Sequence, residues 1–119
     1  MIRIGGAGST LSPRLRQGIL EAEALFLTPF SRVEIAIKYQ LERLTLPTSE
    51  DAFWRETVEL LGATELPFTA VHAGRFATLP LIHRDPFDRM IVAQALAEDL
   101  AIATTDAVFA RYGVRLLTP

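Results

Sequence analysis

Three acidic residues occupy positions from which their carboxylates could share one metal ion. Glu34 lies in an apolar segment, Asp88 in a mainly apolar helical pattern, and Asp106 just after an apolar run. Carboxylates that a fold gathers repel one another, so such a cluster is normally neutralised by a cation. Because the chain has no cysteine, the expected cation is a hard one, Mg²⁺ or Mn²⁺. Such ions serve phosphoryl chemistry, since they stabilise charge on the attacking and leaving oxygens.

Two of these acids also have purely structural explanations, and the sequence leaves both readings open. Ser31 and Glu34 fit a capping box, in which the glutamate accepts a hydrogen bond from the N-cap amide. Glu34 could also pair with Lys38 one turn later. Asp106 could cap the helical turn that follows it. The two histidines have no second ligand at metal spacing, so a surface or packing role is expected for each.

Asp88 is harder to explain as a surface residue. Its neighbours three, four and seven residues later are apolar, so it is expected on the buried face of a helix. A charge there needs a partner, because unpaired burial is costly. The partner could be Arg84, Arg89 or a metal ion. Asp85, just before Pro86, is a natural N-cap for the same helix.

The elements that must position these acids are short apolar strands alternating with helices. Strands are predicted at 25–28, 65–68, 101–104 and 114–117. Helices are predicted from Pro13 to about residue 24, from Ser31 until Pro47, at 50–61, from Thr69 to about 78 and from Asp85 to about 99, with helical turns at 106–112. This alternation predicts an α/β fold, a three-layer α/β/α sandwich with a central parallel sheet. Sites in such sheets form at the carboxyl ends of the strands.

Length and composition indicate one domain, residues 1–119, of a soluble, cytoplasmic protein. Half of the residues are hydrophobic and 22% are charged. No signal peptide is evident, and no apolar run approaches the roughly 18 residues of a membrane span. The net charge of −2 argues against binding duplex DNA by charge alone. A receiver-like phosphotransfer domain would need a lysine near a late strand end, whereas the only lysine, Lys38, lies in the second predicted helix.

Three segments that contain these acids resemble motifs of the PIN-domain family, and within it the VapC toxins of type II toxin–antitoxin systems. SRVEIAIK (31–38), HRDPFDRMIVAQA (83–95) and TTDAVFARYG (104–113) are similar to the segments that carry the family's second, third and fourth acids. Leu44-Thr45-Leu46-Pro47 also follows the first of them as expected. The resemblance covers roughly residues 11–117.

The resemblance implies a Mg²⁺- or Mn²⁺-dependent endoribonuclease. Glu34, Asp88 and Asp106 would be the catalytic metal ligands, with Asp85 as an accessory acid. A metal-activated water would cleave the RNA phosphodiester and leave a 5′-phosphate and a 3′-hydroxyl. The implied partners are the RNA substrate, a second copy of the chain in a homodimer, and a cognate antitoxin protein that inserts a segment into the acidic site.

Two arginines within the segment 83–95 also receive a role from the resemblance. Arg84 and Arg89 are candidates for contacts with RNA phosphates or with a protein partner. Both lie within two residues of an acid of that motif.

The sequence departs from the family at its beginning. Family members usually open with a buried strand that ends in aspartate, ahead of the Leu-Ser-Pro element. Here ten residues precede Leu11, and no aspartate occurs before residue 51. We therefore expect the usual first strand and its acid to be missing. The alternative function is a catalytically impaired PIN module that only dimerises or binds antitoxin.

Overall fold

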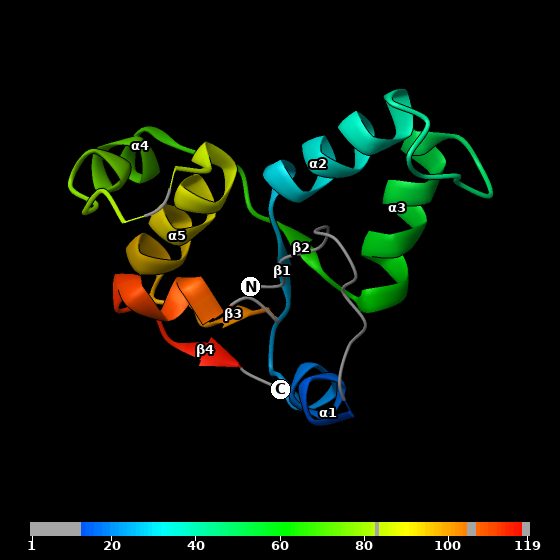
Figure 1. Cartoon of the computed structure of the whole chain (residues 1–119). Helices are drawn as coiled ribbons and strands as arrows, with labels where there is room; N and C mark the ends of the chain where they lie inside the picture. The colour runs from blue at the N-terminus through cyan, green and yellow to red at the C-terminus, as the bar shows by residue number, and fades with distance from the viewer. Residues whose placement is uncertain (1–12, 83, 105–106, 118–119) are drawn as a thin grey trace.

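The computed structural model describes residues 13–82, 84–104 and 107–117, and the statements that follow refer to these residues (Figure 1). The helices are α1 (Pro13–Glu21), α2 (Pro29–Gln40), α3 (Glu50–Leu61), α4 (Ala70–Ala77) and α5 (Pro86–Glu98), with a 3₁₀ helix η1 (Ala107–Tyr112). The strands are β1 (Phe26–Leu27), β2 (Thr64–Glu65), β3 (Ile102–Ala103) and β4 (Leu116–Leu117).

The strands form parallel pairs. β1 pairs with β2, with Phe26 opposite Thr64, and β3 pairs with β4, with Ile102 opposite Leu116. The predicted parallel pairing in an α/β chain is therefore confirmed. Within the described ranges, however, the pairs are two separate two-stranded units. The single central sheet of a three-layer sandwich is not shown.

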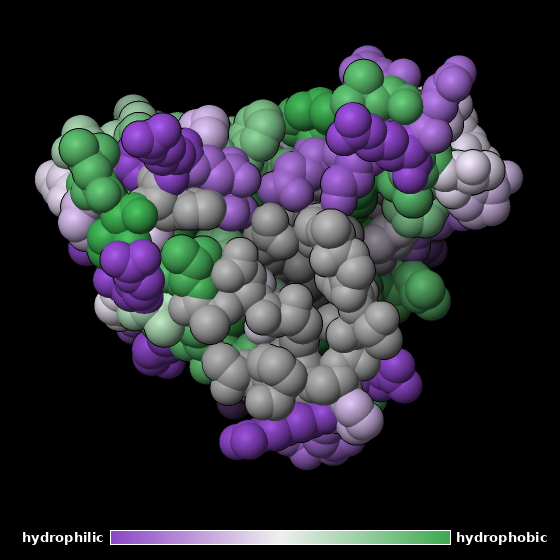
Figure 2. Space-filling model, in the orientation of Figure 1, coloured by the Kyte–Doolittle hydropathy of each residue, from purple (hydrophilic) through white to green (hydrophobic). Residues whose placement is uncertain are grey.

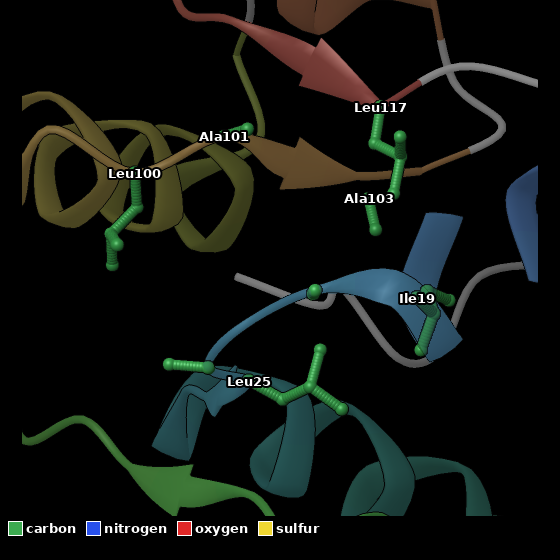
Figure 3. A pocket seen from close by; sticks show the side chains of 8 residues that line it. Ile19, Leu25, Leu100, Ala101, Ala103 and Leu117 are labelled. Atoms are coloured by element: carbon green, nitrogen blue, oxygen red, sulfur yellow. The ribbon is translucent and has the colours of Figure 1, made fainter. Parts of the chain in front are cut away.

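The two strand pairs nevertheless share a hydrophobic core. In Figure 1, α4 and α5 lie on one side of the strands and α2 and α3 on the other. Leu27 of β1 and Ala103 of β3 belong to the same buried cluster, together with Trp54 of α3. An apolar pocket of about 150 Å³ lies between the segment that runs from α1 to β1 and the pair of β3 and β4. Figure 3 shows Ala103 and Leu117 on one side of this pocket and Ile19 and Leu25 on the other.

The start of α2 differs from the sequence prediction. The helix begins at Pro29, and its N-cap is Thr28, whose hydroxyl accepts a hydrogen bond from the Phe30 amide at 3.3 Å. Ser31, the predicted start, lies inside the helix and is fully buried. Proline is well suited to the first helical position because it has no amide to satisfy there. The prediction of a helix starting at Ser31 is therefore wrong.

The ends of the first two helices also come earlier than predicted. α1 ends at Glu21 instead of about residue 24. α2 ends at Gln40, well before Pro47, and Glu42 then adopts a left-handed conformation with φ of 58°. The second strand was predicted at 65–68 but occupies residues 64–65. Pro67 lacks the amide that would extend the ladder.

The other helix boundaries agree closely with the sequence prediction. α3 occupies residues 50–61, with Ser49 as N-cap and Gly62 as a left-handed C-cap at φ of 61°. Thr69 caps α4 and Asp85 caps α5. Among the described residues, no helix combines the length and apolar character needed to span a membrane.

Candidate functional site

The N-terminal ends of α2 and α5 lie against each other. The rings of Phe30 in α2 and Phe87 in α5 have centroids 6.1 Å apart. Thr28, directly after β1, donates a hydrogen bond from Oγ1 to Oε1 of Gln94 in α5 at 2.7 Å. The carboxyl end of β1 is thereby joined to α5. This is the end of a parallel strand where α/β folds build their sites.

Asp88 lies in the first turn of α5 on its buried face. The residue is only 3% exposed, and Ile91 and Val92 on the same side are fully buried. The prediction that Asp88 faces the apolar interior is confirmed. Its first-turn position is favourable for an anion because it lies near the positive end of the helix dipole. Desolvation of this carboxylate must be offset by interactions of its charge.

The arginines considered as partners of Asp88 do not pair with it. Among the described residues, no ion pair or hydrogen bond joins Asp88 to Arg84 or Arg89. Asp88 does take part in another interaction within the chain. Two of the three partners that the sequence left open are therefore excluded.

Asp85 has a defined structural role at the start of α5. Its Oδ1 accepts hydrogen bonds from the amides of Phe87 at 2.9 Å and Asp88 at 3.4 Å. The predicted N-cap is confirmed. The cap fixes the backbone that carries Asp88, so Asp85 supports the candidate acid whether or not it also contacts a metal ion.

Glu34 lies in α2 four residues after Phe30, on the side of the helix that approaches α5. Its Oε1 is buried. The capping box with Ser31 is not formed, because the Ser31 amide donates within the helix start, to the Thr28 carbonyl at 3.1 Å. No ion pair with Lys38 is present among the described residues, although Glu34 takes part in another interaction. Both structural explanations offered for Glu34 are therefore wrong.

Asp106 lies outside the described residues, so its position relative to Glu34 and Asp88 stays a prediction. Thr104, the last described residue before Asp106 in the chain, is buried at the carboxyl end of β3. Within the described ranges, no three His, Asp or Glu side chains form a group that could bind a metal ion. The predicted set of three acids includes Asp106 and is not tested by that finding.

A buried polar network near this site was not predicted. Gln94, fully buried, accepts from Thr28 and donates from Nε2 to the Leu66 carbonyl at 3.0 Å. It therefore links α5 to the residues that follow β1 and β2. The available signal was a glutamine on the otherwise apolar face of the predicted helix, where a polar side chain must find partners.

His72 has a structural role. The side chain is fully buried; its Nδ1 accepts from the Thr69 amide at 3.0 Å, and its Nε2 lies 2.8 Å from Oε1 of Glu98. Because Nδ1 accepts, the proton resides on Nε2, which donates to the carboxylate. The packing role expected for this histidine is confirmed. His83, for which a surface or packing role was also expected, lies outside the described residues.

Arg32, close to Glu34 in sequence, directs its charge toward α3. Its Nε donates to Oε1 of Glu50 at 2.7 Å, and its Nη2 contacts Asp51 at 3.2 Å. The Arg32 hydrogen bond lowers the pKa of Glu50, and the same bond raises the pKa of Arg32. Arg32 therefore links α2 to α3 through both acidic side chains.

Comparison with known proteins yields a family match. A family model described as PIN domain matches residues 8–115. That range contains every described helix and the strands β1, β2 and β3. No curated protein and no solved structure matches the chain significantly.

Proposed function

The chain belongs to the PIN-domain family, whose members are typically metal-dependent nucleases, and from this premise we propose that it is an endoribonuclease of the VapC toxin type. The proposed cofactor is Mg²⁺ or Mn²⁺, and the proposed reaction is hydrolysis of RNA phosphodiester bonds. The proposed metal ligands are Glu34, Asp88 and Asp106.

The observation that carries this proposal is the buried carboxylate of Asp88 beside the junction of α2 and α5. Asp88 is only 3% exposed and lies among fully buried aliphatic residues. Burying a carboxylate in this way costs free energy, and an aspartate with only a surface role would avoid that cost. Glu34 lies on the neighbouring helix α2, four residues after Phe30, whose ring contacts Phe87 of α5. Among the described residues, neither the capping box with Ser31 nor an ion pair with Lys38 accounts for it. All of these donors are carboxylate oxygens, the ligands that hard divalent cations prefer.

The chain's own residues would position the ion and the substrate. When bound, Mg²⁺ supplies charge that stabilises a phosphate undergoing attack and makes water more acidic. Asp85 orders the first turn of α5 and hence the backbone of Asp88. The hydrogen bond from Thr28 to Gln94 joins the start of α2 to the third turn of α5 and so holds the two helices together.

The test is cleavage of a structured RNA by the full chain in Mg²⁺, with EDTA as a control. Asp88→Asn should reduce the rate by about 100-fold or more, because it weakens a ligand that must place the reacting groups to within about 1 Å. The matched control is Asp99→Asn at the other end of α5, where the side chain is 94% exposed. Asparagine tolerates the left-handed conformation of that C-cap, whose φ is 54°.

Each outcome of this comparison separates the two candidate functions. Mg²⁺-dependent cleavage that survives in Asp99→Asn and is lost in Asp88→Asn supports the nuclease. Equal cleavage by both variants would exclude Asp88 from the reaction. A folded, self-associating chain that cuts no RNA in Mg²⁺ or Mn²⁺ would instead be the non-catalytic PIN module.

We also propose two protein partners, a second copy of this chain and a cognate antitoxin. An exposed apolar row, formed by Val33 and Ile37 of α2 and by its C-cap Leu41, supports the homodimer. The antitoxin proposal rests on the VapC-type assignment alone. Co-expression with the protein encoded beside this one, followed by loss of cleavage, would test it.

A further inference from the structure

A second, positively charged pocket opens beside the first turn of α5. It has a volume of about 500 Å³ and is lined by Leu81, Ile82, Arg84 and Arg89. The pocket therefore combines two cationic side chains with two aliphatic ones. Figure 2 shows hydrophobic and hydrophilic surface side by side at the end of the molecule where α4 lies in Figure 1.

The guanidinium of Arg89 lacks a polar partner among the described residues. It stacks on the ring of Phe76, with Cζ 4.7 Å from the ring centroid, while its Nε is buried without a hydrogen-bond acceptor. A buried donor left unsatisfied costs free energy, and the cost is larger for a charged group. Because Arg89 lines the pocket, an anion bound there would meet a guanidinium charge that no carboxylate of the described residues neutralises.

Three other arginines of the chain form ion pairs. Arg32 and Arg115 each pair with a carboxylate of a neighbouring segment, and Arg55 pairs with Asp51 one turn earlier in α3. Among the residues that the structure describes, no ion pair or hydrogen bond involves the side chain of Arg84 or Arg89. Two arginines without carboxylate partners on one pocket mark a place for an external anion.

The position of the pocket indicates which anion. Arg84 directly precedes Asp85, and Arg89 directly follows Asp88, so the cations lie at the same end of α5 as the candidate acids. A strand whose phosphate reaches those acids must pass this end of the helix. The planar guanidinium binds phosphate oxygens in pairs. The aliphatic lining, with Leu81 90% exposed, offers an apolar contact for an unstacked base or ribose.

We propose that Arg84 and Arg89 bind a backbone phosphate of single-stranded RNA beside the linkage that is cut. The pocket would set the path of the substrate into the acidic site and would not take part in the chemistry. This inference rests on the proposed ribonuclease function, because it assigns the substrate of that site. A carboxylate of a protein partner is the competing anion, and the experiment distinguishes the two.

The experiment measures binding of a short fluorescent single-stranded RNA to the full chain by anisotropy. EDTA is present, so that binding is read without cleavage. Arg84→Gln and Arg89→Gln should each weaken binding roughly tenfold, the value expected for a lost charged hydrogen bond. The slope of log affinity against log salt should fall by about 0.7 for each phosphate contact removed. Arg43→Gln, an exposed arginine after α2, is the matched control and should leave both unchanged.

The variants remain informative if one of them folds poorly. Arg84 is exposed, so Arg84→Gln is expected to fold normally even if Arg89→Gln disturbs packing on Phe76. The proposal would be overturned if folded Arg84→Gln and folded Arg89→Gln both bound the RNA with the affinity and the salt slope of the wild type. Retained cleavage by the wild type in Mg²⁺ would then leave the ribonuclease function intact. Loss of self-association in these variants with unchanged RNA binding would assign the pocket to a protein partner and overturn the RNA site.

Discussion

Thr28 makes two polar contacts at the junction of β1, α2 and α5. Its hydroxyl donates to Gln94 and accepts from the Phe30 amide as the N-cap of α2. Thr28→Val should destabilise the chain by about 1 to 3 kcal/mol, since it leaves the buried Gln94 oxygen without its donor. Urea denaturation of the purified chain measures this. Thr28→Ser keeps the hydroxyl and should retain most of the stability; similar losses in both variants would show that methyl packing dominates.

Individual site residues were predictable where spacing revealed the environment. Asp88 was expected on a buried face because apolar residues recur on its side of the helix, and it is buried. The capping role given to Glu34 was wrong, because Thr28 before Pro29 is the stronger helix start. Gln94 was not singled out: a lone polar residue does not reveal which distant backbone groups it will meet. The metal roles of Glu34, Asp88 and Asp106 stay predictions.

The packing of α4 on α5 depends on one histidine. The Nδ1 of His72 accepts a hydrogen bond from the amide of Thr69, the N-cap of α4, and its Nε2 lies 2.8 Å from Oε1 of Glu98 in α5. The His72 side chain has no exposed surface. His72→Ala should cost about 2 to 4 kcal/mol, from lost packing volume and an unsatisfied amide. Thermal or urea unfolding measures the loss. Val71→Ala, at the exposed neighbouring position, is the control and should change stability by at most about 0.5 kcal/mol.

The stability that the link between α2 and α3 contributes should depend on pH. The Arg32 hydrogen bond holds the folded-state pKa of Glu50 below its unfolded value. The contribution of the pair is therefore present above the unfolded pKa and is lost as the pH falls through the lower, folded pKa. Both side chains are partly exposed, so Glu50→Gln should cost only about 0.5 to 1 kcal/mol at neutral pH.

The measurement is the urea midpoint of both proteins at neutral pH and at about pH 3, below the usual glutamate range. The difference between wild type and Glu50→Gln should shrink toward the acidic end. Glu59→Gln, an exposed position on the same helix, is the control. A stability gap that does not change with pH would show that the carboxylate charge of Glu50 is not what links the helices.

Element boundaries were predictable where a residue type dictates backbone geometry. Gly62 closes α3, and Asp85 before Pro86 opens α5. The end of α2 was missed, because its left-handed residue is Glu42, a residue type that seldom adopts positive φ. Each strand spans only two residues, shorter than the apolar runs that predicted it. Ladder length depends on neighbouring strands, which local sequence does not specify.

At the scale of the whole molecule, the two strand pairs are joined by side chains. Leu27 and Ala103 share one buried cluster although β1 and β3 are not paired among the described residues. Alternating helices and apolar runs predicted parallel pairing. They could not predict how the pairs are arranged, since that depends on packing between segments far apart in the chain. The apolar pocket in Figure 3 lies beside this cluster, between the segment that leads into β1 and the pair of β3 and β4.

The last prediction concerns self-association through α2. Val33 and Ile37 are each 39% exposed and Leu41 is 56% exposed, so apolar side chains recur every four residues along one face. A helix face of this kind can pair with its own copy across a two-fold axis. We expect a dimer at micromolar concentration by light scattering. Ile37→Glu should weaken it by at least about tenfold, because a charge at the centre of the interface must be desolvated. Val71→Glu, on α4 and 71% exposed, should leave the dimer intact. A wild-type monomer, or equal weakening by both variants, would show that the α2 row is not the interface.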